Sequence, residues 1–219
     1  MADASARPRR PRADAERNRT RLLDAARAAF ASGGPVVLEQ VARDADVGIG
    51  TLYRHFPTRE ALVAALYWSE LESLCSSAAE LLDAHGTTGH GPEEALRAWM
   101  DRFADYVAAK REMADALRAV FASREAIASE ARPKLAAAVA QILDAGARAG
   151  TMRPDVRADD VVAMIVGMFT ATSLEGGREQ LDRMFGLLLD AVRIRVPVIL
   201  SSMSTEIMGK SMPLDMSDE

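Results

Sequence analysis

The chain has 219 residues, 49% of them hydrophobic and 5% aromatic, so it is long enough to bury one bundle-sized core with a smaller domain beside it. Its single cysteine, Cys75, excludes an intrachain disulfide, and no apolar stretch is long enough to span a membrane, so we expect a cytoplasmic protein with no membrane partner. The net charge of −5 divides unevenly: residues 1–59 carry 11 Lys and Arg against 7 Asp and Glu (net +4), whereas residues 60–219 carry 16 against 25 (net −9). A basic N-terminal unit can approach a polyanion that the acidic remainder would avoid.

Residues 1–13 are rich in arginine and proline, with four arginines and two prolines. Because proline disfavours helix, we predict that this segment is a flexible, extended basic arm. Such an arm can lie along phosphates or reach into a minor groove, or it can be a solubilising tail with no defined contact. The sequence leaves both interpretations open.

The remainder is predicted to be all-α, because runs of β-branched residues are short and helix-favouring residues dominate. A first helix is predicted over residues 14–32, ended by Gly33-Gly34-Pro35. A second is predicted over residues 38–45, which carry apolar residues at helical spacing. The first helix has one apolar face, formed by Leu22, Ala26, Ala29 and Phe30.

The stretch from Asp46 to Phe56 is interpreted as the turn and second helix of a helix-turn-helix. We expect Gly48 and Gly50 to let the backbone turn tightly, because glycine adopts positive φ without penalty. Leu52 and Phe56, four residues apart, would anchor the helix to a core. The outward residues are then donors suited to phosphate oxygens and base edges, namely Thr51, Tyr53, Arg54 and His55.

Residues 45–62, ADVGIGTLYRHFPTREAL, closely resemble the signature of the TetR (tetracycline-repressor-like) transcriptional regulators. The resemblance covers residues 1–66 well and implies a three-helix DNA-binding head at residues 14–57. It also implies a C-terminal helical bundle for ligand binding and dimerisation at residues 58–201. The DNA-binding residues that the resemblance implies are Ile49, Gly50, Thr51, Tyr53, Arg54, His55 and Arg59.

Two positions depart from the family pattern. Val37 stands where a phosphate-binding threonine cap is frequent, and valine can neither cap a helix nor hold a phosphate through a hydroxyl. Gly48 stands where a serine is common. We therefore expect DNA affinity to depend more on charge from elsewhere in the head.

Phe56-Pro57-Thr58 marks a boundary, and Thr58 is predicted to be the N-cap of a long helix that links the head to the bundle. His85 to Pro92 is glycine-rich and contains two histidines five residues apart. A metal site is one interpretation, but the segment has no Cys, Asp or Glu to complete a ligand set. We predict an exposed loop, and neither a metal nor a cofactor.

Three further helices are predicted from Pro92 onward: one opened by Pro92-Glu93-Glu94, one over residues 113–128, and one that Gly150 stops. Residues 95–111 resemble the regulatory domain of an actinobacterial-type TetR subgroup. Apolar residues here and farther on could line a ligand pocket or simply pack the core, and Arg118 could be a polar anchor or solvated. The pocket candidates are Trp99, Met100, Phe103, Tyr106, Met113, Phe121, Met164 and Met168.

The last two long helices are predicted over residues 159–174 and 178–200. Their apolar residues cover more width than one small bundle needs. The resemblance implies a two-fold, four-helix homodimer interface through residues 159–200, whereas the alternative is that both helices complete the monomer core. Residues 202–219 are predicted to be a frayed tail.

These features favour a DNA-binding transcriptional regulator, a repressor that a small, mostly apolar molecule releases from a two-fold related operator. An enzyme is the first alternative, but no nucleophile, base or metal set is evident: His55 lies in the DNA motif, and Cys75 has no evident partner. The second alternative is a helical protein-interaction module whose head no longer binds DNA, to which Val37 gives some weight.

Overall fold

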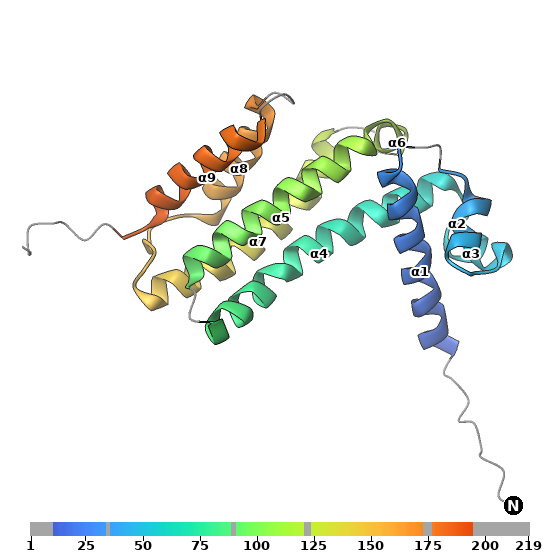
Figure 1. The fold of residues 1–219 in the computed structure, drawn as a ribbon, viewed down its shortest axis with the longest axis horizontal. Helices are drawn as coiled ribbons and strands as arrows, with labels where there is room; N and C mark the ends of the chain where they lie inside the picture. Colours follow the sequence, from blue (N-terminus) through green and yellow to red (C-terminus); the bar gives the residue numbers. More distant parts are fainter. Residues whose placement is uncertain (1–10, 34–35, 89–90, 121–123, 173–176, 195–219) are drawn as a thin grey trace, which may run out of the picture.

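The computed structural model describes residues 11–33, 36–88, 91–120, 124–172 and 177–194, and these form an all-α fold, as predicted (Figure 1). Residues 1–10 of the predicted arm and the predicted tail, 202–219, lie outside the described residues. The helices are α1 (Pro11–Ala31), α2 (Leu38–Asp44), α3 (Ile49–His55), α4 (Arg59–Thr88), α5 (Pro92–Glu112), α6 (Ala114–Val120), α7 (Arg124–Ala149), α8 (Ala158–Ala171) and α9 (Gly177–Val192).

Helix α4 runs through most of the molecule, and the other helices are arranged along it (Figure 1). Helices α1, α2 and α3 gather around its N-terminal end and form the head. Helices α5 and α7 pack along the rest of α4 and form the body, and α8 and α9 pack against the side of this layer that faces away from α4. The molecule is therefore elongated, with the head at one end and the α8–α9 pair toward the other.

The head has its own hydrophobic core, in which α1, α2 and α3 close over the first turns of α4. Leu22, Leu52 and Leu62 are all fully buried there. Three residues from much later in the chain complete this core: Met113, Ala116 and Leu117, at and within α6. The head is thus not confined to residues 14–57, because the start of α4 and α6 are part of its packing.

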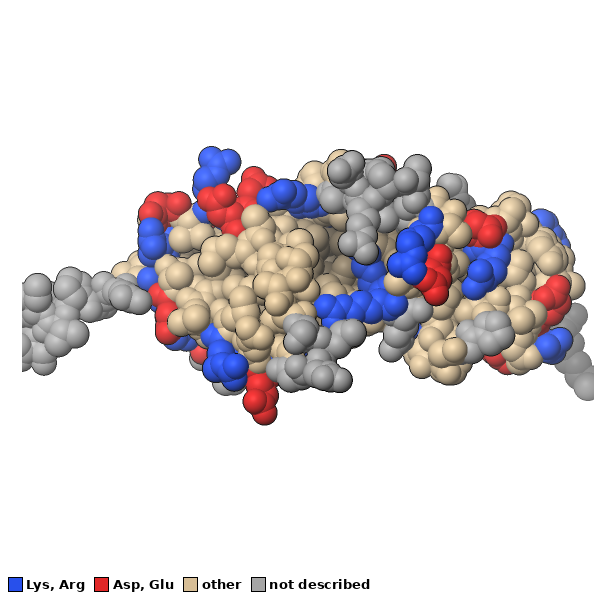
Figure 2. Space-filling model, turned by 90° about the horizontal axis from the view of Figure 1, so that it is seen from above, with Lys and Arg blue, Asp and Glu red and all other residues tan. Residues whose placement is uncertain are grey.

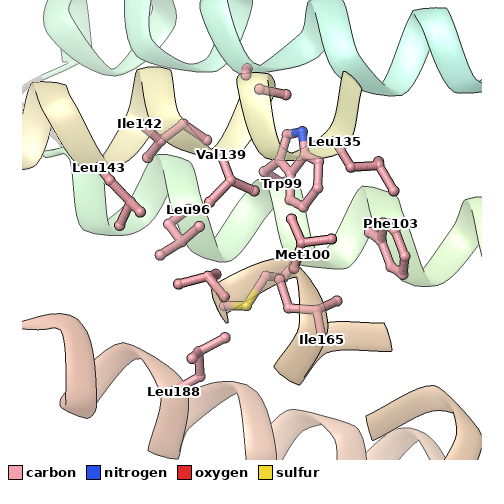
Figure 3. Close-up of a cluster of buried hydrophobic side chains, with 14 of the residues drawn as sticks. Leu96, Trp99, Met100, Phe103, Leu135, Val139, Ile142, Leu143, Ile165 and Leu188 are labelled. Carbon is pink, nitrogen blue, oxygen red and sulfur yellow. The ribbon is translucent and has the colours of Figure 1, made fainter. Parts of the chain in front are cut away.

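A second hydrophobic core fills the body between α4, α5, α7, α8 and α9 (Figure 3). Trp99 lies at its centre with no exposed surface, and its indole N–H donates a hydrogen bond to the carbonyl oxygen of Leu74 at 3.1 Å. Met100 and Ile142 are also fully buried beside it. This packing joins the layers of the body into one unit.

The two cores meet at aromatic side chains of α4 and α5. Trp68 and Tyr106 pack against both cores, and the ring centroids of Tyr67 and Tyr106 are 6.3 Å apart. Burial raises the pKa of both tyrosines, so neither hydroxyl ionises near neutral pH. Nearby, the Arg27 guanidinium on α1 binds the Glu70 carboxylate on α4 at 2.5 Å. Head and body are therefore in direct packing contact.

The start of α1 and the end of α4 differ from the predicted helix boundaries. Helix α1 begins at Pro11, three residues before the predicted start, because the fixed φ of proline suits a first helical turn. Helix α4 continues to Thr88, so His85 to Thr88 are helical and not part of a loop. A single glycine such as Gly86 costs a helix only about 1 kcal/mol, which the packing of the α4 face can offset.

The prediction of one helix over residues 113–128 was wrong, because α6 ends at Val120 and α7 begins at Arg124. Helix α7 then runs through Pro133, whose missing N–H is offset by the burial of Ala131 and Leu135 on either side. Gly150 ends α7 with a φ of +72°, as expected.

Helix α9 ends at Val192, earlier than predicted, because the backbone there pairs with the segment after α7. The Arg153 N–H donates to the Val192 carbonyl at 2.9 Å, and the Ile194 N–H donates to the Thr151 carbonyl at 3.0 Å. Residues 195–200 of the predicted helix lie outside the described residues.

Gly146→Ala is expected to destabilise the fold by about 1–3 kcal/mol, because a Cβ there would lie 2.8 Å from the Cβ of Met152 and closer still to its Cγ and Sδ. Thermal or urea unfolding of the purified protein measures this. Gly50→Ala is the matched control, since a Cβ at Gly50 meets nothing within 4 Å. Equal stability of the two variants would contradict the packing described for Met152.

Candidate nucleic-acid interface

The turn between α2 and α3 is made by Asp46, not by the two glycines that the sequence pointed to. Asp46 has a φ of +50°, whereas Gly48 has a φ of −60° and Gly50 lies within α3. The N–H of Asp46 donates to the Arg43 carbonyl at 3.0 Å, and the N–H of Val47 donates to the Ala42 carbonyl at 2.9 Å. This is the hydrogen-bond pattern of a helix ended by one left-handed residue, a conformation that aspartate tolerates better than most.

Helix α3 is held by two buried side chains, as predicted. Leu52 is fully buried and Phe56 is 2% exposed, both in the head core. The Arg19 guanidinium of α1 lies 5.7 Å from the centre of the Phe56 ring, a contact that the sequence did not suggest. The side of α3 opposite these anchors is consequently fixed in its orientation toward solvent.

The predicted DNA-binding residues lie on that outward side of α3. Ile49 is 41% and Tyr53 43% exposed, Arg54 is exposed, and Thr51 and His55 are half-buried. Gly50 is exposed on the same helix, and Arg59 is exposed at the first residue of α4. The structure thus brings all seven predicted residues to the outward part of the head around α3.

Arg54 and Tyr53 are positioned by neighbouring polar groups. The Arg54 Nε donates to the Gly50 carbonyl at 3.1 Å, so its side chain lies back along α3. The Tyr53 hydroxyl is 3.5 Å from a carboxylate oxygen of Glu39, near the start of α2. Sequence reasoning missed Glu39, because its proximity to Tyr53 depends on the angle between α2 and α3. Glu39 adds a negative charge to an otherwise donor-rich surface.

Some arginines of the head are paired with carboxylates and others are not. Arg21 is paired with Asp46 at 2.9 Å and Arg27 with Glu70. Among the side chains that the structure describes, no carboxylate forms an ion pair with Arg54 or Arg59. Arg54 and Arg59 are therefore two cations on this surface that remain available to an external anion.

Glu60 lies next to Arg59 at the start of α4. A hydrogen bond from its own backbone N–H, and then one involving the Thr58 hydroxyl, lower the pKa of the Glu60 carboxyl, so this group is ionised at neutral pH. The Thr58 hydroxyl oxygen also accepts a hydrogen bond from the Ala61 N–H at 3.1 Å, which supports its predicted role as a cap.

The two departures from the family pattern are both exposed. Val37 is 47% exposed and makes no side-chain cap at the start of α2, as expected from its chemistry. A Cβ added at Gly48 would meet nothing within 4 Å, so this glycine leaves open space beside the turn. Neither position is required for packing within the chain.

The predicted pocket residues are divided among different surroundings. Trp99, Met100, Phe103 and Met168 belong to the body core, Tyr106 packs against both cores, and Met113 belongs to the head core. Met164 does not point inward, because it lies on the outer face of α8 with 48% of its surface exposed. Phe121 lies outside the described residues. Arg118 is solvated and pairs with Asp115 of its own helix.

Within the described parts of the chain, no group of three or more His, Cys, Asp or Glu side chains could hold a metal ion. None of the described helices is both long enough and apolar enough to cross a membrane. The polar groups around α3 include the Arg54 guanidinium and the Tyr53 hydroxyl, which are suited to contacts with phosphate oxygens and base edges.

Two family models match the chain. Residues 22–66 match the model described as bacterial regulatory proteins, tetR family, and residues 91–194 match that of the SbtR-like transcriptional regulator C-terminal domain. No match was found among curated proteins.

Solved structures of similar fold agree with these matches. The chain is 42% identical to a TetR transcriptional regulator from Streptomyces coelicolor, with a TM-score of 0.66, covering 81% of this chain and 99% of that one. It is 35% identical to a TetR transcription regulatory protein from Mycobacterium vanbaalenii, with a TM-score of 0.64, covering 84% of this chain and 99% of that one.

Asp46→Ala is expected to destabilise the head by about 1 kcal/mol, because alanine adopts positive φ less readily than aspartate. Asp46→Gly should stay within about 0.5 kcal/mol of the parent, since glycine adopts this conformation freely. Urea unfolding separates the two variants. If Asp46→Gly were as destabilised as Asp46→Ala, the ion pair with Arg21 and not the backbone would account for the role of Asp46.

Proposed function

Because this chain belongs to the TetR family of transcriptional regulators, whose members are DNA-binding proteins and not enzymes, we propose that it is a homodimeric repressor that a small molecule releases from its operator. The observation that carries this proposal is the outward face of α3. Leu52 and Phe56 fix the helix from behind, while Tyr53 and Arg54 face solvent, and none of the described carboxylates forms an ion pair with Arg54.

In this function, α3 enters the major groove of DNA. Thr51, Tyr53 and Arg54 contact phosphates and base edges, and Arg59 contacts the backbone beside the groove. Ile49, Gly50 and His55 complete the contact surface around α3. The open space beside Gly48 and Gly50 lets the sugar-phosphate backbone approach closely. Glu39 would repel a phosphate placed next to Tyr53, which directs the tyrosine toward a base edge or sugar.

Dimerisation is supported by the outer face of α8 and α9. Four large apolar side chains are exposed there, at and around the two helices: Met164 at 48%, Val166 at 43%, Leu187 at 70% and Ile194 at 41%. A Cβ at Gly167, which follows Val166 on α8, would meet nothing within 4 Å of the same chain. Figure 2 shows an area without charged side chains over this end of the molecule. Exposed apolar surface of this kind is typical of an interface.

A two-fold dimer through α8 and α9 places one head on each side of the interface. Two-fold readers of DNA bind half-sites about 34–36 Å apart, which is one turn of the duplex. Release requires a ligand that binds more tightly to a state in which the two heads are spaced differently. Since α4 contributes to both the head and body cores, a change in its tilt alters this spacing.

Arg54→Ala is expected to weaken binding to DNA from the chain's own upstream region by roughly tenfold or more, in line with about 1–3 kcal/mol for a specific contact. Fluorescence anisotropy with a salt titration measures this. The control is Arg118→Ala, which removes the same charge from α6, where Arg118 pairs with Asp115. Equal affinity of the protein for upstream and random DNA would favour the protein-interaction alternative.

Leu187→Glu is expected to convert the dimer into monomers and to abolish tight operator binding, because it places a charge in an apolar interface. Sedimentation velocity measures the mass. Ala79→Glu, at another exposed site, on α4 and away from α8 and α9, is the control and should leave the dimer intact. A Leu187→Glu protein that remains dimeric would place the interface elsewhere.

A further inference from the structure

The surface of the body has a cavity of about 160 Å³ that is partly open to solvent, and none of the predicted pocket residues lines it. It lies between the last turns of α5, the end of α8 and the start of α9. Seen from above, the molecule is hollowed between the α8–α9 pair and the corner where α5 meets α6, and Lys and Arg side chains border this hollow (Figure 2). An enclosed cavity of roughly 150 Å³ holds benzene, so this volume matches a molecule with a single ring.

The lining of this cavity combines an apolar wall with positive charge. Val107, Phe169 and Leu181 provide most of the apolar wall, one from each of the three helices. Two arginines, Arg111 and Arg178, also line it, and none of the nine lining residues is acidic. A site of this composition favours a molecule with an apolar body and a negative charge.

The two arginines differ in how their charge is used. The Arg178 guanidinium is shared by three aspartates, with Asp101 at 3.1 Å, Asp105 at 3.6 Å and Asp182 at 3.8 Å, so its charge is largely balanced. Arg111 donates one hydrogen bond to the Phe169 carbonyl at 3.3 Å. Among the described acidic side chains, none forms an ion pair with Arg111, which leaves most of its five donors for a ligand.

We propose that this cavity binds a small amphipathic anion, of the class of aromatic monocarboxylates, with Arg111 as the charge partner and the apolar wall around the ring. The carboxylate accepts two parallel hydrogen bonds from the Arg111 guanidinium. Phe169 lies against the ring and is itself packed on Phe103 of the body core, with ring centroids 5.3 Å apart. A ligand that contacts Phe169 is therefore one side chain away from the body core.

Arg111 also lies next to the head. It belongs to the last turn of α5, and Met113 two residues later is already part of the head core together with Leu117 of α6. A ligand that draws Arg111 toward the cavity therefore shifts the junction between α5 and α6, and this junction contributes Met113 to the head core. A role of this anion as the effector rests on the function proposed above. Its binding to the cavity does not depend on that function.

Benzoate is the probe, and benzamide, which has the same shape without the charge, is its control. Calorimetric titration of the full-length protein is expected to show saturable benzoate binding that is roughly tenfold or more tighter than benzamide binding, as for a hydrogen bond to a charged group. Equal binding of the two compounds, or no saturable binding of benzoate, overturns the proposal.

Arg111→Gln is expected to lose the preference for benzoate, and Ala108→Phe, at an exposed lining position, is expected to lose binding of both compounds by filling the cavity. Arg102→Gln is the matched control on the same helix, because Arg102 pairs with Glu80 and does not line the cavity. Benzoate binding by Arg111→Gln as tight as by the parent overturns the assignment of the site.

A DNA-binding measurement in the presence of benzoate separates this inference from the proposed function. Benzoate is expected to weaken specific DNA binding by the parent but not by Arg111→Gln. Specific DNA binding without benzoate binding overturns the anion site alone. Benzoate binding that depends on Arg111, in a protein without specific DNA binding, upholds the site and overturns the repressor function instead.

Discussion

The structure depends on one helix that belongs to two hydrophobic cores. The N-terminal part of α4 contributes Leu62 and Leu66 to the head core, and the next turns contribute Leu71 and Leu74 to the body core. A helix of 30 residues is about 45 Å long and resists bending along its axis. The direction in which the head faces is therefore determined by how α4 lies against α5 and α7, and a small rotation at the body end becomes a larger displacement at the head.

Ion pairs add a second set of contacts between helices. Arg54 and Arg59 of the head lack a carboxylate partner among the described residues, whereas four arginines of the body pair with acidic side chains of another helix, namely Arg97, Arg102, Arg178 and Arg193. Arg97 pairs with Asp101 and Asp182, and Arg193 pairs with Glu93, so α9 is attached to α5 by ion pairs near both of its ends. Arg111 forms no ion pair with the described acidic side chains, and it lies where the body meets the head.

Much of this architecture was predictable from the sequence. Helical periodicity indicates the helices and their buried faces, and the motif at residues 45–62 indicates the helix-turn-helix. The buried anchors Leu52 and Phe56 and the exposed Tyr53 and Arg54 follow from spacing alone. Other features could not be predicted, since they arise from contacts between distant segments. The left-handed turn fell on Asp46 despite two nearby glycines, and the approach of Glu39 to Tyr53 depends on an interhelical angle. The cavity beside Arg111 joins residues from three helices, and no single stretch of sequence marks it.

Because α6 packs into the head core, the head is not a unit that can be separated cleanly from the body. Residues 22–66 match the family's head as a unit of sequence, yet Met113, Ala116 and Leu117 fill part of the same interior. A fragment cut after residue 66 would expose the apolar surface that these three side chains cover. A chimeric regulator that grafts this head onto another body therefore needs an α6 that can fill the same space.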